Sequence, residues 1–532
     1  MFKTTSKQQP WSIDGWVVLF LAIAALTLWL INLGELPLRD WDEGYYATTA
    51  RDIYWSNNWF DLTYLQEHFW YKPPLMFWLT AFSYHLFGVS EFSSRLPVAT
   101  ITALGVPLLY LVSKELFQER SPALLSAGTY LTLLPVVRHG RLAMMDGLIL
   151  TLVLISSWGL LKGRSPQSKW IILLGLGLGG IALTKSILAI LIAAIFFFII
   201  IINRWFFLLK NLWLWLGLLL GILPILGWYA LQIDHYGEAY IQVHFQSQSI
   251  DRITSAIEGN DGSIFYYALE IFKYTWPWLL FLPQGLILGF KERQKVWAKF
   301  ALGSAGLYFI VVSIMGTKLP WYIFPIYPFL CLIIGASLTH YQKNLKKIKS
   351  TKFLAGIFFF LSLVSIIGEF YFLQAEPQLP LLILAPLLAV TFLITGILLW
   401  RKKNTFIAVL MSGTYLVLIL LFCSDVWLWE LNEAFSVKPV GLFIQEKLSD
   451  RVLEKPIYTS FAYNRPSLDF YSEVRVIPQN PTELQALAKQ DNYFLLNAPN
   501  LENLETQNPE ILGSIEIPFD ASQFYLVHTK DQ

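Results

Sequence analysis

The chain alternates long apolar runs with short polar connections. Stretches such as ILAILIAAIFFFIIII (187–202) are too apolar and too long for the core of a water-soluble domain. Each such run predicts a helix that crosses a membrane. We expect thirteen of them: residues 16–33, 97–113, 122–137, 142–161, 170–184, 186–202, 211–233, 276–290, 299–316, 320–340, 353–374, 381–400 and 404–422. Runs 170–184 and 186–202 adjoin at Lys185, which leaves one long helix as an alternative.

A further apolar run, PLMFWLTAFSYHLFG (74–88), is shorter than the others. As a helix it reaches about 22 Å, less than the roughly 30 Å of a bilayer core. If it lies on the membrane surface, opened by Pro73 and Pro74, the basic clusters between the remaining helices all fall on one side. That arrangement satisfies the positive-inside rule. It predicts a cytoplasmic N-terminus, a retained signal anchor at 16–33 and a C-terminus outside the cell's inner membrane.

Three sizeable polar segments then lie on the outer side. They are a first outer loop (34–96), a second outer loop (234–275) and a tail (423–532). The tail contains alternating stretches, EKPIYTSFAY, VRVIPQ, NYFLLN and SQFYLVHT, which are typical of short strands. We therefore expect a mostly α polytopic membrane helical bundle over 1–422, with outer juxtamembrane helices, and a small α/β domain over 423–532.

Composition agrees with a membrane protein and excludes several functions. The chain is 55% hydrophobic and only 14% charged, whereas soluble domains average about 25% charged residues. The net charge of +2 gives no reason to expect nucleic acid as a partner. No phosphate-binding Gly-rich loop, HExxH or paired-cysteine metal motif occurs, and GLGLGG (175–180) lies in an apolar run, where it predicts helix packing.

Ionisable residues gather at the outer ends of the predicted helices. They are Asp42, Glu43, Lys72, Arg141, Asp146, Lys185, Arg252 and Lys318, the last with Tyr322. Charged groups near a membrane require a partner or a function, and both signs together fit a site that accepts a proton and binds an anion. An offset of four predicts that Lys318 and Tyr322 share a helix face suited to a phosphate.

Each of these residues also has a purely structural interpretation. The acidic pair Asp42 and Glu43 suits the first turn of a helix, and Lys72 suits a lysine that extends to the interface. Arg141 and Asp146 are close enough in sequence to pair with each other, and Arg252 fits a solvated surface charge. These alternatives stay open at the level of sequence.

Six short motifs occur in a fixed order. They are WDEGYYATTARDI, YKPPL, FSSRLP, RLAMMDG, LTKS and TKLPWYIFPIYP. In this order they resemble the bacterial lipid-linked glycosyltransferases of the GT-C superfamily, in particular the aminoarabinose transferases that modify lipid A and the related protein O-mannosyltransferases. The resemblance extends from about residue 16 to 440.

The resemblance implies an activity and a role for each residue. Such enzymes move a sugar from a polyprenyl phosphate (undecaprenyl or dolichyl) to a lipid, glycan or protein acceptor at the outer face, with inversion. Asp42 matches the first-loop aspartate, which is taken to be the base or the carboxylate that orients the acceptor, and Glu43 beside it is a second catalytic candidate. Lys72 matches the lysine that binds the donor phosphate. Further phosphate contacts are expected at Arg252, Lys318 and Tyr322, and supporting roles at Arg141, Asp146 and Lys185. The resemblance implies no cofactor, although it leaves a divalent metal open.

Some positions depart from the family pattern. An arginine usually follows the acidic pair where this chain has Tyr45 and Tyr46, and a glutamate usually precedes the lysine where it has Tyr71. These differences weaken the inference of lipid A as acceptor. A transporter or lipid flippase is the alternative from another class. It would require broken helices at the bilayer midplane and internal repeats, for which Lys185 between two short runs is the one supporting feature.

Overall fold

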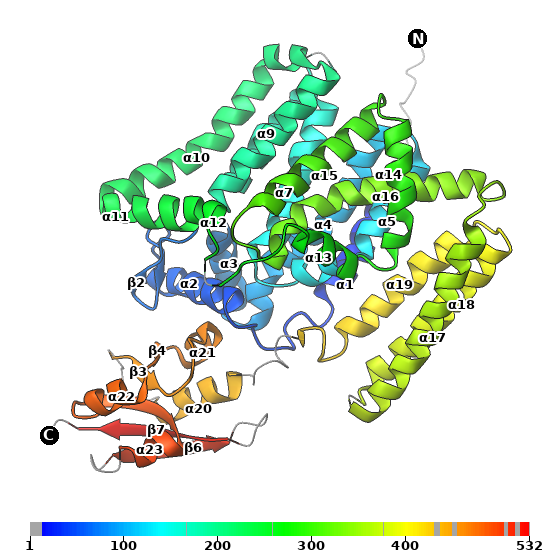
Figure 1. Cartoon of the computed structure of the whole chain (residues 1–532). Coiled ribbons are helices and arrows are strands. Elements are labelled where there is room, and N and C mark those ends of the chain that lie inside the picture. The colour runs from blue at the N-terminus through cyan, green and yellow to red at the C-terminus, as the bar shows by residue number, and fades with distance from the viewer. Residues whose placement is uncertain are drawn as a thin grey trace, which may run out of the picture. The chain divides into compact units, whose positions relative to one another are not determined.

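The structure is a computed structural model that describes residues 13–530 except 166, 258, 376, 430–436, 449–454, 505–508 and 517–521. Its residues form two compact units (Figure 1). The first unit contains Met1–Asn32, Trp70–Met76 and Val98–Ser424, and the second contains Leu33–Phe69, Phe77–Pro97 and Asp425–Gln532. Most of the first outer loop thus packs with the C-terminal residues, while the division after residue 422 stays a prediction.

The first unit is helical. Its long helices are α1 (Ile13–Leu30), α4 (Glu91–Phe117, beginning in the second unit), α7 (Met145–Lys162), α9 (Ser186–Asn203), α10 (Leu212–Tyr236), α15 (Val296–Ile314), α16 (Tyr327–Asn344), α17 (Thr351–Ala375) and α18 (Leu379–Trp400). Shorter helices are α5 (Arg120–Leu131), α6 (Leu134–Gly140), α8 (Ile172–Ala182), α11 (Glu238–Ile241), α12 (Asp251–Thr254), α13 (Tyr266–Tyr274), α14 (Leu282–Lys291) and α19 (Phe406–Phe422). Four segments are 3₁₀ turns, η1 (Lys169–Ile171), η2 (Phe206–Lys210), η4 (Trp278–Phe281) and η5 (Pro320–Ile326), and η3 (Gln242–Ile250) is a π-helix.

Within the described residues, nine helical segments are long and apolar enough to cross a membrane. All nine overlap predicted spans, and three shorter apolar helices match the predicted runs 170–184, 276–290 and 404–422. The expected single helix over 122–137 is wrong, because α5 ends at Leu131 and α6 begins at Leu134. Pro135 fits the break, because it has no backbone N–H to bond the Leu131 carbonyl oxygen as a continuous helix would require. The count of thirteen spans stays a prediction.

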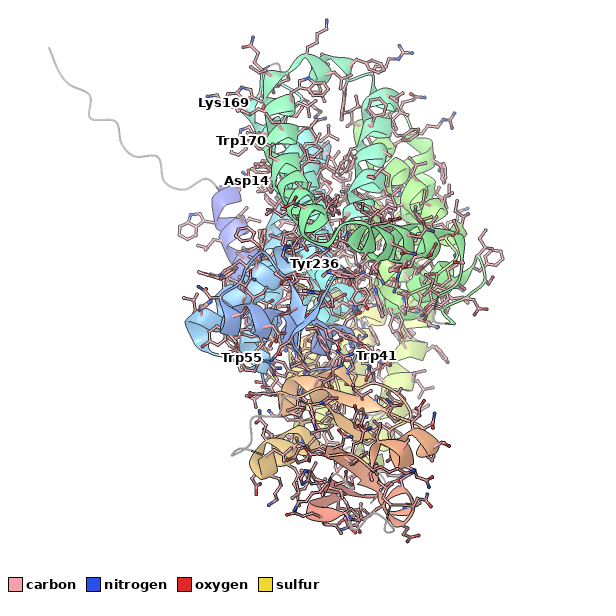
Figure 2. The ribbon with its side chains drawn as sticks, turned by 90° about the vertical axis from the view of Figure 1, so that its left-hand side faces the viewer. Asp14, Trp41, Trp55, Lys169, Trp170 and Tyr236 are labelled. Atoms are coloured by element: carbon pink, nitrogen blue, oxygen red, sulfur yellow. The ribbon has the colours of Figure 1, made fainter. Side chains whose placement is uncertain are left out.

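Lys185 separates two helices. It adopts an extended conformation between α8 and α9 (φ −144°, ψ 91°), so the alternative of one long helix is wrong. Helix α8 packs closely on α10, because a Cβ added at Gly175 or Gly179 would collide with the backbone of Gly217 or Gly221. The glycines of GLGLGG therefore serve helix packing, as predicted. Helix α10 extends from the end of the unit marked by Lys169 and Trp170 to the end marked by Tyr236 (Figure 2).

The second unit combines helices with a mixed sheet. Its elements are α2 (Asp42–Ser56), β1 (Thr63–Tyr64), β2 (Glu67–His68), most of α3 (Leu75–Phe87), α20 (Lys438–Leu448), β3 (Ile457–Thr459), α21 (Pro466–Ser472), β4 (Val476–Pro478), α22 (Pro481–Leu487), β5 (Asn492–Asn497), α23 (Ala498–Glu502), β6 (Glu510–Glu516) and β7 (Gln523–Thr529). The five-stranded sheet has the order β4-β3-β5-β7-β6. Strand β3 is parallel to β4 and β5, whereas β7 is antiparallel to β5 and β6. The four predicted strands correspond to β3, β4, β5 and β7, and the α/β prediction is confirmed.

Helix α2 is held in this unit by close contact with α21. A Cβ at Gly44 would collide with the backbone of Pro466 and Ser467, so only glycine permits this approach. One apolar core includes Leu38 and Ala47 from the α2 region together with Ile444 and Leu468 from the C-terminal part. The acidic start of α2 is therefore fixed by tertiary packing.

A buried carboxyl group lies beside this core. Asp469 accepts hydrogen bonds from the Tyr64 hydroxyl (2.6 Å) and from the Val476 backbone N–H (2.9 Å). Burial is the main cause that raises the pKa of Asp469 to about 7, and the nearby charges of Arg475 and Arg51 offset only part of that effect. The folded unit thus favours the protonated carboxyl.

This pKa gives a pH dependence of stability. Because the pKa of Asp469 is higher in the folded state than in an unfolded chain, its contribution is complete below about pH 4. The contribution is lost as the pH rises through about 7. We expect Asp469→Asn to reduce the fall in Tm of the second unit between pH 5 and 8, measured by thermal unfolding in detergent. Exposed Glu446→Gln is the control, and a pH-independent difference between Asp469→Asn and wild type would contradict the assignment.

Candidate active site

A cavity of about 310 Å³ lies in the first unit, among the segment before α3, the starts of α7 and α9, the π-helix η3, the end of α15 and η5. Its polar lining includes Lys72, Asp146, Lys185, Ser186, His244, Gln248, Arg252 and Tyr322. Five of the predicted site residues, Lys72, Asp146, Lys185, Arg252 and Tyr322, are therefore brought together. They come from segments up to 250 residues apart in sequence (72 to 322).

Positive charge predominates at this cavity. Among the described lining residues there are three cations, Lys72, Lys185 and Arg252, and one carboxylate, Asp146. Lys185 Nζ lies 2.8 Å from Asp146 Oδ1 and 5.6 Å from the centre of the Tyr322 ring. Arg252 donates a hydrogen bond of 3.3 Å to the hydroxyl of the same tyrosine. Tyr322 thus links two of the cations, and the excess charge suits an anionic ligand.

The remaining walls are aliphatic. Helix α9 contributes Ile187, Leu188 and Leu191, and the end of α15 contributes Val311, Val312, Ile314 and Met315. A cavity with cations among its polar groups and hydrocarbon elsewhere fits a ligand that carries both an anionic group and an apolar chain.

His244 on η3 joins three walls of the cavity. Its Nδ1 lies 2.9 Å from the carbonyl oxygen of Trp70, which can only accept, so Nδ1 carries the proton. Its Nε2 lies 3.1 Å from the Tyr229 hydroxyl and 3.3 Å from Ser186 Oγ, which can donate to it. Burial, with the charge of Lys72 as a smaller cause, lowers the pKa of His244 to about 4. The imidazole is therefore neutral at physiological pH.

Lys72 is held by the same π-helix. Its Nζ donates a hydrogen bond of 3.0 Å to Gln248 Oε1, one turn beyond His244. Neither His244 nor Gln248 can be selected from the sequence, because both lie in a polar segment without helical periodicity of apolar residues. A π-helix is rare and often marks a functional segment, but its hydrogen-bond pattern cannot be recognised from residue types.

The predicted catalytic acids lie in the second unit. Asp42 is the first residue of α2 and is half-buried. Its carboxylate makes no hydrogen bond or ion pair with any residue that the structure describes. Glu43, next in sequence, is completely buried and accepts a hydrogen bond from the Arg39 backbone N–H (2.9 Å). The two neighbouring carboxylates thus have opposite environments.

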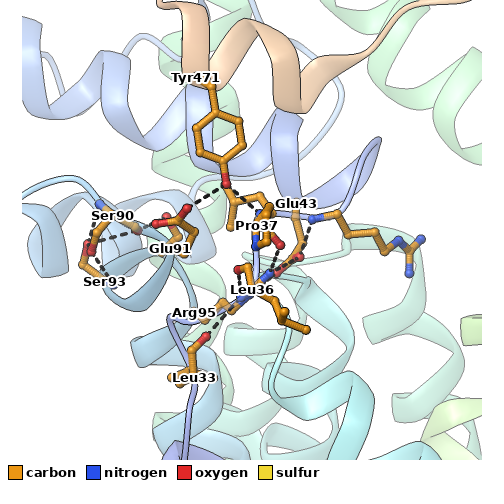
Figure 3. Close-up of polar contacts among 12 residues, drawn as sticks. Leu33, Leu36, Pro37, Glu43, Ser90, Glu91, Ser93, Arg95 and Tyr471 are labelled. Carbon is orange, nitrogen blue, oxygen red and sulfur yellow. Dashed lines mark hydrogen bonds and ion pairs between the residues drawn. The ribbon is translucent and has the colours of Figure 1, made fainter. Parts of the chain in front are cut away.

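Arg95 forms a bidentate ion pair with Glu43 (Figure 3). Arg95 Nε lies 2.9 Å from Glu43 Oε1 and Nη2 lies 3.0 Å from Oε2. The guanidinium also donates to the carbonyl oxygens of Leu33, Leu36 and Pro37, at 3.0, 2.8 and 2.7 Å. Both side chains are completely inaccessible to solvent. This cluster fixes the chain that leads into α2.

Arg141 and Lys318 do not line the cavity described above. Arg141 donates to the carbonyl oxygens of Leu28 (2.7 Å), Trp29 (3.0 Å) and Ile31 (2.5 Å) at the end of α1. Lys318 donates to the carbonyl oxygens of Ser313 (2.7 Å) and Met315 at the end of α15. Both cations thus satisfy carbonyl groups that a helix end leaves without partners.

The expected shared helix face of Lys318 and Tyr322 is wrong. Tyr322 lies in the 3₁₀ segment η5, which begins at Pro320, after Lys318. Burial lowers the pKa of Lys318. For a metal ion, no group of three or more His, Cys, Asp or Glu side chains gathers among the described residues.

Comparisons with known proteins agree on one class. A family model for dolichyl-phosphate-mannose-protein mannosyltransferases matches residues 71–229. The undecaprenyl phosphate-alpha-4-amino-4-deoxy-L-arabinose arabinosyl transferase of Yersinia pestis is 28% identical over 334 residues, which are 61% of this chain and 60% of the relative. The corresponding transferase 1 of Pseudomonas fluorescens is 27% identical over 331 residues, with the same shares. The match therefore spans about three fifths of these relatives' length.

Solved structures extend the likeness to the whole fold. ArnT from Cupriavidus metallidurans bound to undecaprenyl phosphate has a TM-score of 0.76 and 22% identity, covering 97% of this chain and 98% of that one. The apo oligosaccharyltransferase of Archaeoglobus fulgidus has a TM-score of 0.53 and 10% identity, covering 92% and 70%. The chain is a multi-pass membrane protein with the fold of ArnT, and the predicted fold class is confirmed. Within that class, its resemblance to the aminoarabinose-transferase type is confirmed by both sequence and fold.

The buried pair at α2 provides a stability test. Arg95→Met leaves the Glu43 carboxylate without its cation in a site closed to water, so we expect the free energy of unfolding to fall by about 3–5 kcal/mol. Equilibrium unfolding of the purified protein in detergent would measure the change. Lys447→Met, which removes an exposed ion pair with Glu446, should cost at most about 1 kcal/mol. Equal effects of the two substitutions would contradict the role assigned to Arg95.

Proposed function

We propose that the chain is a glycosyltransferase of the cell's inner membrane that moves a sugar from a polyprenyl-phosphate donor to an acceptor at the outer face. The carrying observation is the cavity in the first unit, where Lys72, Lys185, Arg252 and Tyr322 line a space with aliphatic walls. A polyprenyl phosphate has the matching chemistry, because its phosphate is anionic and its tail is hydrocarbon. The named donors of the similar proteins, undecaprenyl phosphate and dolichyl phosphate, support this choice.

The cations would act on the leaving group. As an acceptor oxygen bonds to the anomeric carbon, the bond from that carbon to the phosphate oxygen breaks, and the phosphate takes the electron pair. Lys72 and Arg252 would stabilise the charge that develops there, in a cavity of low dielectric constant. Lys185, held by Asp146, would support the same charge through Tyr322. Attack from the face opposite the phosphate inverts the anomeric centre.

Asp42 would accept the proton of the acceptor hydroxyl. A general base needs a carboxylate that other groups do not occupy, and Asp42 has no partner among the described residues. Glu43 is fully engaged by Arg95 and by the Arg39 N–H. We therefore propose Glu43 as a positioning residue that fixes the first turn of α2. Lys318 and Arg141 would act indirectly, by holding the ends of α15 and α1.

A protein acceptor is a second candidate. The family model that matches residues 71–229 describes protein mannosyltransferases, so transfer to a serine or threonine hydroxyl uses the same donor chemistry. The transporter or flippase alternative has no corresponding support, because the similar proteins are named as transferases. The proposed orientation has the N-terminus in the cytoplasm and residues 423–532 outside, as the basic clusters predict.

A transfer assay tests the proposal. Membranes that contain the protein would receive radiolabelled sugar on undecaprenyl phosphate, either aminoarabinose or mannose, and incorporation into lipid, glycan and protein fractions would be measured. We expect Asp42→Asn to lower kcat by about 100-fold or more, since it removes the base. We expect Lys72→Ala to raise the donor KM by about tenfold, since it removes a charge-assisted contact.

The control is Lys346→Ala, an exposed lysine in the turn between α16 and α17. It should leave both constants unchanged. Unchanged transfer by Asp42→Asn and Lys72→Ala, with both variants folded and inserted, would contradict the assignment of these two residues to the active site. Absence of transfer by the wild type from either donor would exclude those two sugars.

A further inference from the structure

Trp41, the residue before Asp42, has a strained backbone. Its φ of 66° and ψ of −111° lie in a region that side-chain-bearing residues rarely adopt. Such strain persists only where the surrounding structure imposes it, and it concentrates at functional sites. Despite this conformation, Trp41 leaves 49% of its surface exposed. The strain therefore does not serve to bury the indole.

The surroundings of Trp41 are rigid. Asp40 forms an ion pair with Arg465 and also accepts hydrogen bonds from the backbone N–H (3.2 Å) and the hydroxyl of Ser467. Gly44 lets the first turn of α2 touch the backbone of Ser467. The segment around Trp41 and the segment 463–467 are thus fixed to each other on both sides of Trp41.

This arrangement aligns two aromatic rings. Trp41 and Tyr463 are nearly parallel, with an interplanar angle of 16° and 6.0 Å between ring centroids. Tyr463 is also 45% exposed, and the Arg465 guanidinium carbon lies 5.7 Å from the centre of its ring. Two large, exposed and nearly parallel rings therefore stand together, and one of them, Trp41, directly precedes Asp42, whose carboxylate has no partner among the described residues.

We propose that Trp41 and Tyr463 form an aromatic platform that binds a sugar ring of the acceptor. One face of a pyranose ring consists of C–H bonds with a small positive charge, which complement the negative face of an aromatic ring. The sugar hydroxyls stay at the rim, where they remain hydrated or reach a carboxylate. The proposal rests on the proposed function for its role, because it makes the acceptor a carbohydrate, on a glycan or a lipid.

A membrane-interface belt and a peptide-binding surface both fit this geometry less well. An interface belt also uses Trp and Tyr. It requires neither a strained backbone at Trp41 nor the contacts of Asp40 with Arg465 and Ser467. A peptide acceptor would bind through an open strand edge or a groove for a helix, whereas the platform presents ring faces. A carbohydrate uses the ring faces themselves.

Saturation-transfer NMR tests the platform directly. The full-length protein in a detergent without a sugar headgroup would be titrated with methyl β-glucopyranoside, methyl β-galactopyranoside and methyl β-mannopyranoside. We expect saturation of ring C–H protons of at least one saccharide. In Trp41→Ala and Tyr463→Ala we expect affinity to fall by about three- to tenfold, while Trp41→Phe and Tyr463→Phe retain a ring and most of the affinity.

Phe60→Ala is the matched control. Phe60 is 61% exposed and lies in the same compact unit, but it is not a member of the Trp41–Tyr463 pair. Tyr463→Ala leaves the strained Trp41 backbone in place, so it keeps the test valid if Trp41→Ala disturbs the fold. Equal losses in Phe60→Ala and Tyr463→Ala, or equal saccharide saturation in wild type and Tyr463→Ala, would overturn the platform.

The transfer assay separates this proposal from the proposed function. With wild-type transfer established, Tyr463→Ala should raise the acceptor KM and leave the donor KM unchanged. Incorporation only into protein, unaffected by Tyr463→Ala, would overturn the carbohydrate acceptor and keep the transferase. Saccharide binding without transfer from any polyprenyl phosphate would keep the platform and overturn the transferase.

Discussion

A charged side chain in a membrane protein needs a partner, because burial in a medium of low dielectric constant is costly. The partners of each cation distinguish the cations that stabilise the fold from those that could bind a ligand. Arg95 uses its whole guanidinium on Glu43 and three carbonyl oxygens, with no surface left for a ligand. Arg141 and Lys318 are consumed by the carbonyl ends of α1 and α15. Lys72, Lys185 and Arg252 differ, because they line a cavity. Of these cations, only the last three line a space that an anion could enter. We therefore interpret the first group as structural and propose the second group as the anion-binding one.

Much of the fold follows from apolar runs, because length and hydrophobicity alone decide whether a helix can cross a bilayer. The failures have local causes. The break at 132–133 depends on Pro135, whose missing backbone N–H outweighs the apolar pattern. Strand β6 is not predicted, because a shift in its pairing register between Ile511 and Gly513 interrupts the alternation of inward-facing and outward-facing side chains. The segment after Lys318 forms a 3₁₀ turn, so α-helical spacing does not apply there.

The candidate site is predictable only in part. Lys72, Asp146, Lys185, Arg252 and Tyr322 can be selected because an ionisable or phenolic group at a helix end is unusual in a membrane chain. The pairing of Glu43 with Arg95, 52 positions apart, cannot be selected, because it depends on tertiary packing. His244 has no sequence signal at all, since its importance comes from a carbonyl and two hydroxyls supplied by distant segments.

Donor and acceptor pose different recognition problems, and the two compact units have correspondingly different surfaces. A lipid-linked phosphate needs cations beside hydrocarbon, which the helical unit provides at its cavity. A hydroxylated acceptor needs flat apolar faces with a nearby base, and in our proposal the second unit provides them at Trp41, Tyr463 and Asp42. The family match over 71–229 includes Lys72 and Lys185 but excludes Arg252 and Tyr322 as well as both rings of the platform. The matched segment therefore holds only part of the proposed donor site and none of the proposed acceptor platform.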